Sequence, residues 1–374
     1  MAFQSVRDLN VKGSRVFLRA DLNVPLKEGR ITDATRVKET LPTLKCLLDG
    51  GASVVLASHL GRPEGKGFEA AYSAAPVAAW LCEQGFDCRL ASYVNGEAVE
   101  AEAAALKPGQ ILLLENLRFE KGETKNKEEF ADSLARLADT YVNDAFGSAH
   151  RAHASVSGMV ARFPKDRVAA GFLMEKELKA LTKVTESPDK PLVVIFGGAM
   201  SYTFLKAQGY EIVKSLCEED KLEMSLELLK QAQAKGTRLL LPLDHVAADA
   251  FKEDADCGIT LDQNIPAGRM ALDIGPETVA LYAAEIRAAR TLLGNGPMGV
   301  FEMAPFASGT LTMAEELAEA ADKGAFVLVG GGDSVAAVNK AGVAARMSHV
   351  STGGGASLEF LSGLELPGVA ALSK

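Results

Sequence analysis

Short apolar runs alternate along the chain with longer stretches rich in alanine and leucine. A short run that is apolar at every position is typical of a strand buried on both faces, whereas the longer stretches have the apolar spacing of helices. Strand and helix in turn predict parallel sheets covered on both faces. The first half has predicted strands at residues 15–23, 53–61, 88–91, 110–119 and 140–147 and predicted helices at 35–50, 74–85 and 127–138.

The second half repeats the alternation, and between the halves residues 171–191 combine a long helix with a polar segment ending at a proline. Because 374 residues exceed the size at which one core keeps growing, we expect two domains. The predicted class is α/β, with two doubly wound parallel-sheet, Rossmann-like domains, 1–170 and 171–355, joined by a hinge helix. The predicted strands of the second half lie at 193–198, 237–245, 290–297, 326–332 and 349–355.

Composition narrows the class of protein. Hydrophobic residues make up 48% and charged residues 24% of the chain, as in soluble globular proteins. No apolar run approaches the ~18–20 residues that span a bilayer, and the first residues lack a secretory pattern. A net charge of −9 opposes general binding to nucleic acid or membrane surfaces. The five cysteines form no C-x-x-C pair, which favours free thiols in a reducing cytoplasm.

Three predicted strands end in glycines where a helix should begin: VVIFGGA (193–199), FVLVGGGDS (326–334) and HVSTGGGAS (349–357). Glycine lets the backbone approach a bulky anion, and the start of a helix offers unpaired N–H groups and a positive dipole end. The alternative is that these glycines only make tight turns. Because two of the turns have nearly the same pattern, the sequence predicts a polyphosphate site.

Basic and hydrogen-bonding residues collect where the first-half strands end. Arginine suits bidentate contact with carboxylate or phosphate, and histidine is expected to add donors that gain charge near neutral pH. A single arginine such as Arg7, Arg30 or Arg89 is more simply a solvated charge. Convergence at one sheet edge instead predicts an anion site. The residues concerned are Arg19, Asp21, Asn23, Arg36, His59, Arg62, Arg118, His150, Arg151 and His153.

Other chemistries lack support in the sequence. His150 and His153 could bind zinc as an i, i+3 pair, but no clear third ligand has metal-site spacing. A nicotinamide-dependent dehydrogenase needs G-x-G-x-x-G after the first strand, which is absent. An anion site together with a polyphosphate site favours phosphoryl transfer. Asp333 would then hold Mg²⁺ at the phosphates, although Asp333 or Ser334 could instead be a helix N-cap.

The chain resembles the phosphoglycerate kinases from end to end. The strings that carry the resemblance are RVFLRADLNVPL, SHLGRP, LLLENLRF, NDAFGSAHRAHAS, GNGPMGVFE, VLVGGGDS and STGGGASLEFL. The resemblance implies glycolytic formation of ATP from 1,3-bisphosphoglycerate and MgADP, and the reverse reaction. It also implies a cytoplasmic monomer of two hinged domains, whose C-terminal tail, 356–374, packs on the N-terminal domain.

The resemblance also implies roles for individual residues. It gives catalytic roles to Arg36, Gly332 and Gly354, with Arg36 neutralising charge on the moving phosphoryl group. The residues implied for 3-phosphoglycerate are Asp21, Asn23, Arg36, His59, Leu60, Gly61, Arg62, Arg118, His150, Arg151 and His153. Those implied for the nucleotide are Gly197, Gly198, Asn295, Glu302, Gly330, Gly331, Gly332, Asp333, Ser334, Gly353, Gly354 and Gly355, with Asp333 also at Mg²⁺.

One departure from the family pattern bears on the chemistry. GGA at 197–199 passes directly into MSYTFLKAQG, so about 25 residues, roughly one strand–helix unit, are missing relative to the pattern. In the family this unit carries lysines that contact the phosphates. Because losing a strand would leave unpaired backbone groups and a void, we expect the full protein to contain this unit. The chain should then show a break or an abrupt jump near Ala199–Met200. A real deletion would instead favour a pseudoenzyme that binds 3-phosphoglycerate. A lesser departure is Gly294, where the family usually has tryptophan.

Overall fold

The computed structural model describes residues 3–373. The chain forms two compact units: unit 1 runs to Leu181 and includes the segment that begins at Gly353, and unit 2 is Thr182–Thr352. The boundary between Leu181 and Thr182 falls inside helix α6 (Phe172–Thr185). Most of α6 and the glycines at 353–355, which the sequence grouped with the C-terminal domain, belong to unit 1 by their contacts.

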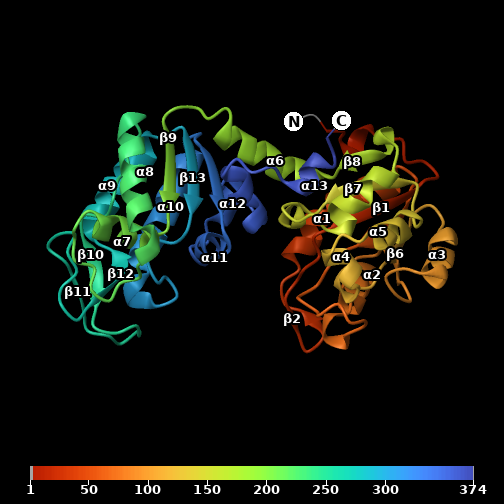
Figure 1. The fold of residues 1–374 in the computed structure, drawn as a ribbon, viewed down its shortest axis with the longest axis horizontal. Helices are drawn as coiled ribbons and strands as arrows, with labels where there is room; N and C mark the ends of the chain where they lie inside the picture. The colour runs from red at the N-terminus through yellow and green to blue at the C-terminus, as the bar shows by residue number, and fades with distance from the viewer. Residues whose placement is uncertain (1–2, 374) are drawn as a thin grey trace. The chain divides into compact units, whose positions relative to one another are not determined.

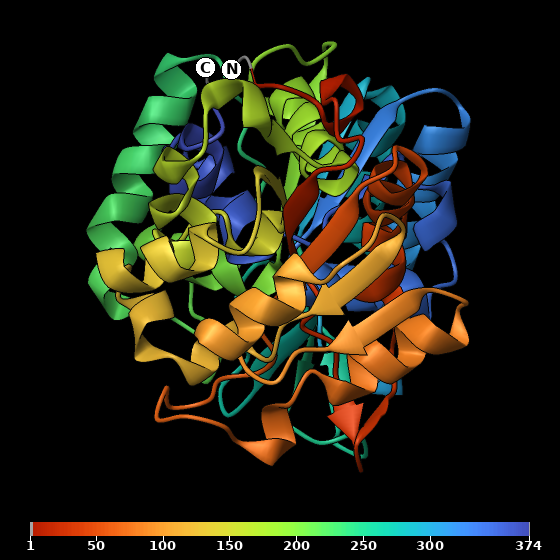
Figure 2. The same ribbon diagram turned by 90° about the vertical axis from the view of Figure 1, so that its right-hand side faces the viewer.

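Within the described residues, unit 1 has a six-stranded parallel sheet in the order β5-β6-β4-β1-β7-β8 (Figure 1). Figure 2 shows helices on both faces of this sheet. Its strands are β1 (Arg15–Ala20), β4 (Ser53–Ala57), β5 (Asp87–Leu90), β6 (Gln110–Leu113), β7 (Thr140–Asp144) and β8 (Val168–Ala170). The helices around it are α1 (Thr35–Asp49), α2 (Ala75–Glu83), α3 (Glu97–Ala104), α4 (Lys121–Thr124), α5 (Glu128–Ala135), α6, α12 (Gly355–Leu361) and α13 (Pro367–Ala370), and β2 (Leu26–Lys27) pairs with β3 (Arg30–Ile31).

The core explains why these runs form strands. Val16 and Leu18 of β1 and Val54 of β4 are fully buried against Leu44 and Leu47 of α1. Residues that alternate with them face the other side, where Phe17 is also fully buried. Both faces of the central strands are therefore covered, as the continuous apolar runs predicted. The chain leaves β1 toward β4 on one side and later enters β7 on the other, which creates a switch point between β1 and β7.

In unit 2, the described strands form a four-stranded parallel sheet in the order β15-β14-β13-β9 and a small antiparallel sheet in the order β11-β10-β12. The parallel strands are β9 (Leu192–Phe196), β13 (Thr291–Asn295), β14 (Phe326–Gly330) and β15 (His349–Val350), and the others are β10 (His245–Ala248), β11 (Cys257–Ile259) and β12 (Met270–Ile274). The helices are α7 (Gly198–Ala207), α8 (Leu222–Ala234), α9 (Pro276–Ala288), α10 (Ser308–Asp322) and α11 (Gly332–Lys340). The predicted α/β class is thus confirmed.

The strand predicted at 237–245 is wrong. Within the described chain, residues 238–243 make no backbone-to-backbone hydrogen bond, and His245 begins the antiparallel strand β10. An extended segment becomes a strand only when a neighbouring strand pairs with it. Among the described residues, no strand pairs with 238–243.

The predicted chain break near Ala199–Met200 is also wrong. The backbone is continuous, and α7 runs through both residues directly after β9. The cost expected from the missing strand is instead visible at the edge of the sheet. Among the described strands β9 pairs with β13 alone, and Val194 and Phe196 are 37% and 56% exposed. This edge has unpaired backbone groups and apolar side chains in contact with solvent.

Candidate functional sites in the two units

The switch point of unit 1 gathers the predicted anion-binding residues. Ala20 at the end of β1 lies in register with Asp144 at the end of β7. The segment 21–23 therefore leaves the sheet at the same edge as 145–153, which carries His150, Arg151 and His153. The carboxyl end of β4 adds His59, and η3 (Leu117–Phe119), the turn after β6, adds Arg118.

Hydrogen bonds hold three of these side chains in place. Arg36, in the first turn of α1, forms an ion pair with the buried Asp21. The side-chain oxygen of Asn23 accepts the Gly61 N–H at 2.8 Å, and Arg118 Nη1 donates to the Gly61 carbonyl at 2.7 Å. Gly61 has φ +58°, and a Cβ there would lie 2.5 Å from the Tyr72 ring. The SHLGRP turn is thus held by hydrogen bonds to both the N–H and the carbonyl group of Gly61.

The expectation that the histidines gain charge near neutral pH is wrong. Burial, followed by the positive charge of Arg19, holds the pKa of His59 well below its usual value. Burial, followed by Arg118, lowers the pKa of His153 to about 4, and burial and Arg151 lower that of His150. An imidazole among guanidinium groups in a desolvated site is neutral because a further positive charge is unfavourable there.

The cationic charge therefore belongs to the arginines. Burial, followed by repulsion from Arg151 and Arg19, lowers the pKa of Arg118 to about 10, and Arg62 also contributes. Arg62 and Arg151 are exposed, and Arg151 Nε donates to His150 Nε2 at 3.1 Å. Crowded guanidinium groups repel one another unless an anion lies between them. The cluster thus suits a small molecule with more than one negative charge.

The supporting roles of Asn116, Ser155 and Glu123 were not predicted from the sequence. Asn116 donates to the carbonyl of the buried Leu60 at 2.7 Å and accepts the Arg118 N–H at 3.1 Å. Ser155 donates from N and Oγ to the fully buried Glu123. The only sequence signals were polar residues inside apolar strings, and these do not reveal partners that lie far along the chain.

In unit 2, the glycine turn after β9 packs closely on the turn after β13. Gly197 N–H donates to the Asn295 carbonyl at 3.0 Å, and Gly198 N–H donates to the Pro297 carbonyl at 2.9 Å. A Cβ at Gly198 would lie 1.9 Å from the Met298 carbonyl oxygen, so no side chain fits. The predicted residues Gly197, Gly198 and Asn295 therefore come together.

The turn after β14 joins them. Gly331 has φ +92°, and a Cβ there would lie 2.6 Å from Asn295 Oδ1. Ser334 Oγ accepts the Gly296 N–H, and Gly331 is the N-cap of α11, so neither Asp333 nor Ser334 is the N-cap residue. No side chain caps α11 within the described chain, which leaves its first N–H groups for an anion.

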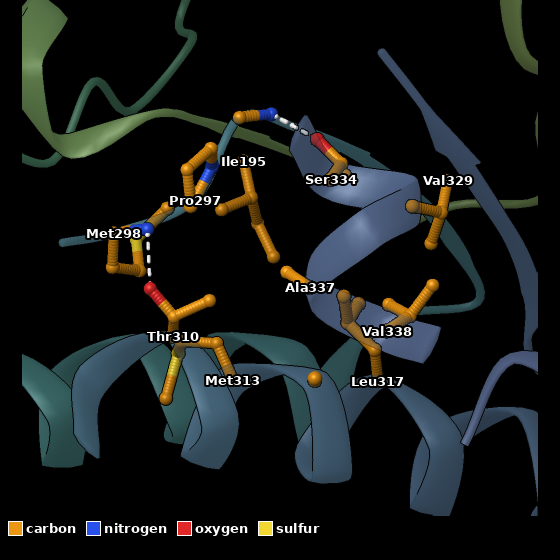
Figure 3. Close-up of a pocket in the computed structure, with 13 residues that line it drawn as sticks. Ile195, Pro297, Met298, Thr310, Met313, Leu317, Val329, Ser334, Ala337 and Val338 are labelled. Atoms are coloured by element: carbon orange, nitrogen blue, oxygen red, sulfur yellow. Dashed lines mark hydrogen bonds between the residues drawn. The ribbon is translucent and has the colours of Figure 1, made fainter. Parts of the chain in front are cut away.

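Figure 3 shows an apolar cavity beside these turns. Its lining includes Gly294, Gly296 and Ser334, together with Met313 and Leu317 of α10. Gly294 leaves this space because it has no side chain where the family usually has tryptophan. The departure therefore changes packing behind the turn.

Asp333 is exposed in the first turn of α11, beside Gly331 and Gly332. No three His, Cys, Asp or Glu side chains of residues 3–373 are grouped to hold a metal ion alone. One exposed carboxylate at an anion-binding helix start fits Mg²⁺, which usually keeps waters and binds through one or two carboxylates plus phosphates. Glu302 is exposed in the loop that Lys340 Nζ holds through the Phe301 carbonyl at 2.6 Å.

The third glycine turn lies in unit 1. A Cβ at Gly353 would be 2.5 Å from the Phe146 ring, and one at Gly355 would be 3.5 Å from His150 Nε2. Gly353, Gly354 and Gly355 are therefore beside the basic cluster, and their contacts are separate from those of Gly331.

Comparisons with known proteins agree along the whole chain. A family model described as phosphoglycerate kinase matches residues 6–200 and 194–364. A phosphoglycerate kinase of Moorella thermoacetica is 50% identical over 401 positions, covering 100% of each chain. A cytosolic phosphoglycerate kinase of Triticum aestivum is 50% identical over 393 positions, covering 98% of this chain and 97% of the relative.

Solved structures show the same likeness. The phosphoglycerate kinase of Coxiella burnetii has a TM-score of 0.89 and 38% identity, covering 100% of this chain and 99% of the other. That of Pyrococcus horikoshii has a TM-score of 0.80 and 30% identity, covering 99% and 98%.

The comparisons also locate the missing unit. Residues 194–200 are matched twice by the family model, once at the end of the first segment and once at the start of the second. The alignment with the Moorella relative has 401 positions against 374 residues here, so at least 27 positions (401 less 374) have no counterpart in this chain.

Proposed function

Because the chain belongs to the phosphoglycerate kinase family, we propose that it transfers a phosphoryl group reversibly from 1,3-bisphosphoglycerate to ADP, giving 3-phosphoglycerate and ATP. The observation that carries the proposal is the cluster of guanidinium groups at the switch point of unit 1, fixed by Asp21, Asn23 and Gly61. The turns of unit 2 supply the complementary site for a polyphosphate tail.

In unit 1, Arg62, Arg118 and Arg151 would hold the phosphate and carboxylate of the triose acid. Arg36, oriented by Asp21, would neutralise charge on the moving phosphoryl group. The attacking oxygen is already anionic, so the reaction needs no general base. Catalysis then depends on position and charge.

In unit 2, the N–H groups at the start of α11 would bind the nucleotide phosphates, with Asn295 near them. The Gly197–Gly198 turn would border the adenine, and Glu302 would lie at the ribose. Asp333 would hold Mg²⁺, which would offset the negative charge of the nucleotide phosphates. Gly354 and Gly355, after Gly353, would offer N–H groups near the transferring group.

Oligomeric state, location and domain motion are proposed from the family resemblance. We propose a monomer of the cytoplasm in which the two units move about α6, the helix that joins them in sequence. No helix among residues 3–373 is long and apolar enough to cross a membrane. The relatives include a cytosolic form, which supports this location.

Because the missing unit carries the family's phosphate-contacting lysines, the decisive measurement is whether the protein turns over substrate. Intact mass first verifies that the purified protein has 374 residues. An assay that couples 1,3-bisphosphoglycerate formation from 3-phosphoglycerate and MgATP to NADH oxidation should then show turnover. Arg36→Met should lower kcat about 10²–10³-fold, as loss of a transition-state charge contact does, whereas the matched Arg89→Met on the exposed face of β5 should not. Binding of 3-phosphoglycerate by calorimetry without any turnover would refute the proposal.

A further inference from the structure

Arg19 at the end of β1 is a cation with no exposed surface. Its Nε donates to Ser155 Oγ at 2.9 Å, and Ser155 Oγ in turn donates to Glu123 Oε1 at 2.6 Å. The buried positive charge is thus connected to a buried carboxylate through one hydroxyl group. This arrangement fixes the direction of the guanidinium plane, since Nη1 also donates to the Ala20 carbonyl.

The remaining arm of the guanidinium points at His59. Arg19 Nη2 lies 3.2 Å from His59 Nδ1 and 3.5 Å from Ser148 Oγ. Arginine has only N–H donors and stays protonated, so His59 Nδ1 must be the acceptor in this contact. A neutral imidazole that accepts at Nδ1 carries its proton on Nε2.

Protonation of both ring nitrogens is opposed by the surroundings. His59 is almost fully buried, and a proton on Nδ1 would place an N–H against an N–H of Arg19. The largest electrostatic influences on His59 come from Arg19 of β1, Arg36 of α1, Arg118 of η3 and His153 in the loop after β7. None of them offers a negative charge to an imidazolium ion.

We infer that Arg19 is a positioning residue that locks His59 as the Nε2–H tautomer, so that His59 meets the substrate anion as a neutral hydrogen-bond donor. The identity of that anion as 3-phosphoglycerate rests on the proposed function, but the tautomer does not. The arginines around the ligand then supply the positive charge, and His59 supplies a hydrogen bond that orients the anion. Affinity through His59 would be independent of pH across the range in which free histidine titrates.

Nitrogen-15 NMR of the histidine rings, without substrate, tests the tautomer directly. The signals of His59 are assigned by their loss in His59→Gln. Between pH 5.5 and 8 we expect a protonated Nε2 and an unprotonated Nδ1, with no titration. A proton on Nδ1, or a titration midpoint near 6.5, would overturn the inference. This measurement uses the unaltered protein, so it holds even if Arg19 variants do not fold.

Kinetics test the role. His59→Gln places an amide N–H near the Nε2 position, whereas the matched His59→Asn keeps an oxygen for Arg19 but has no donor there. We expect KM for 3-phosphoglycerate to stay within about threefold in His59→Gln and to rise about tenfold in His59→Asn, the size of one hydrogen bond, with KM for ATP unchanged. Arg19→Lys should mix the two tautomers and raise the same KM. Equal effects of Gln and Asn would contradict the role, whereas absence of turnover in the unaltered protein would refute only the proposed function.

Discussion

Arg118 donates to the carbonyl oxygen of Gly61 at 2.7 Å, which ties the turn after β6 to the turn after β4. Lysine is a single-point donor on a flexible stem and cannot reproduce both this bond and a bidentate contact. Arg118→Lys should therefore raise KM for 3-phosphoglycerate about tenfold or more. Steady-state assays check this, with Arg89→Lys, on an exposed strand position, as the control. Equal KM values in the two variants would exclude the role of Arg118.

The stability of unit 1 should depend on the protonation of Asp144. Its Oδ1 accepts the N–H groups of Leu173 and Met174 at the start of α6, and burial raises the pKa of Asp144 to about 7. The unfolded chain releases this proton near its ordinary pKa of 3.8. Between these values the folded state binds more protons, so the contribution of Asp144 to stability falls as pH rises, by at most about 1.4 kcal/mol per pH unit.

Asp144→Asn keeps an acceptor for α6 and removes the titration. Urea unfolding at pH 5 and pH 7.5 should therefore show a smaller loss of stability with rising pH in this variant than in the unaltered protein. Asp49→Asn replaces an exposed carboxyl group and is the control. The same slope in all three proteins would show that Asp144 does not titrate in this window.

Two glycines of unit 2 should respond in opposite ways to alanine. A Cβ at Gly294 would lie 3.4 Å from Leu317 Cδ1, in ordinary contact beside the cavity of Figure 3. Gly294→Ala should stabilise the protein by about 0.4–1 kcal/mol, since it restricts the unfolded chain. Gly296 has φ +107°, and its Cβ would lie 2.6 Å from Gly197, so Gly296→Ala should destabilise by about 1–3 kcal/mol. Chemical unfolding that changes the free energy of unfolding in the same direction in both variants would contradict this.

The unpaired edge of β9 should promote aggregation. The stretch LVVIF has no charge, and Val194 is partly exposed on it. Val194→Lys should slow the growth of light scattering on warming several-fold, because a charge on an edge strand opposes pairing with another chain. Leu261→Lys adds the same charge at a fully exposed turn and is the control. If both variants aggregate at one rate, the β9 edge is not responsible.

The sequence predicted those parts of the fold that depend on local pattern. The run RVFLRA gave β1, and SVVLA gave β4, because each is apolar enough to be buried on both faces. The run TRLLLPLD looked the same, yet it forms no strand, since strand formation also requires a neighbour that lies elsewhere in the chain. In the site, too, local motifs were predictable and partners distant in the chain were not. Motifs identified Arg36 and His59, but not Arg19 as the partner of His59 across 40 positions, nor the neutral state that this contact imposes.

The direct passage from β9 into α7 has a consequence for how the shorter chain arose. Residues 194–200 belong to both segments matched by the family model, on either side of the absent module. Recombination between two such similar coding stretches removes everything between them and leaves one intact copy of the loop. Such an excision would join a strand to a helix at a glycine pair that serves both. A whole βα layer would thereby be lost in one genetic event, without a foreign joint in the polypeptide.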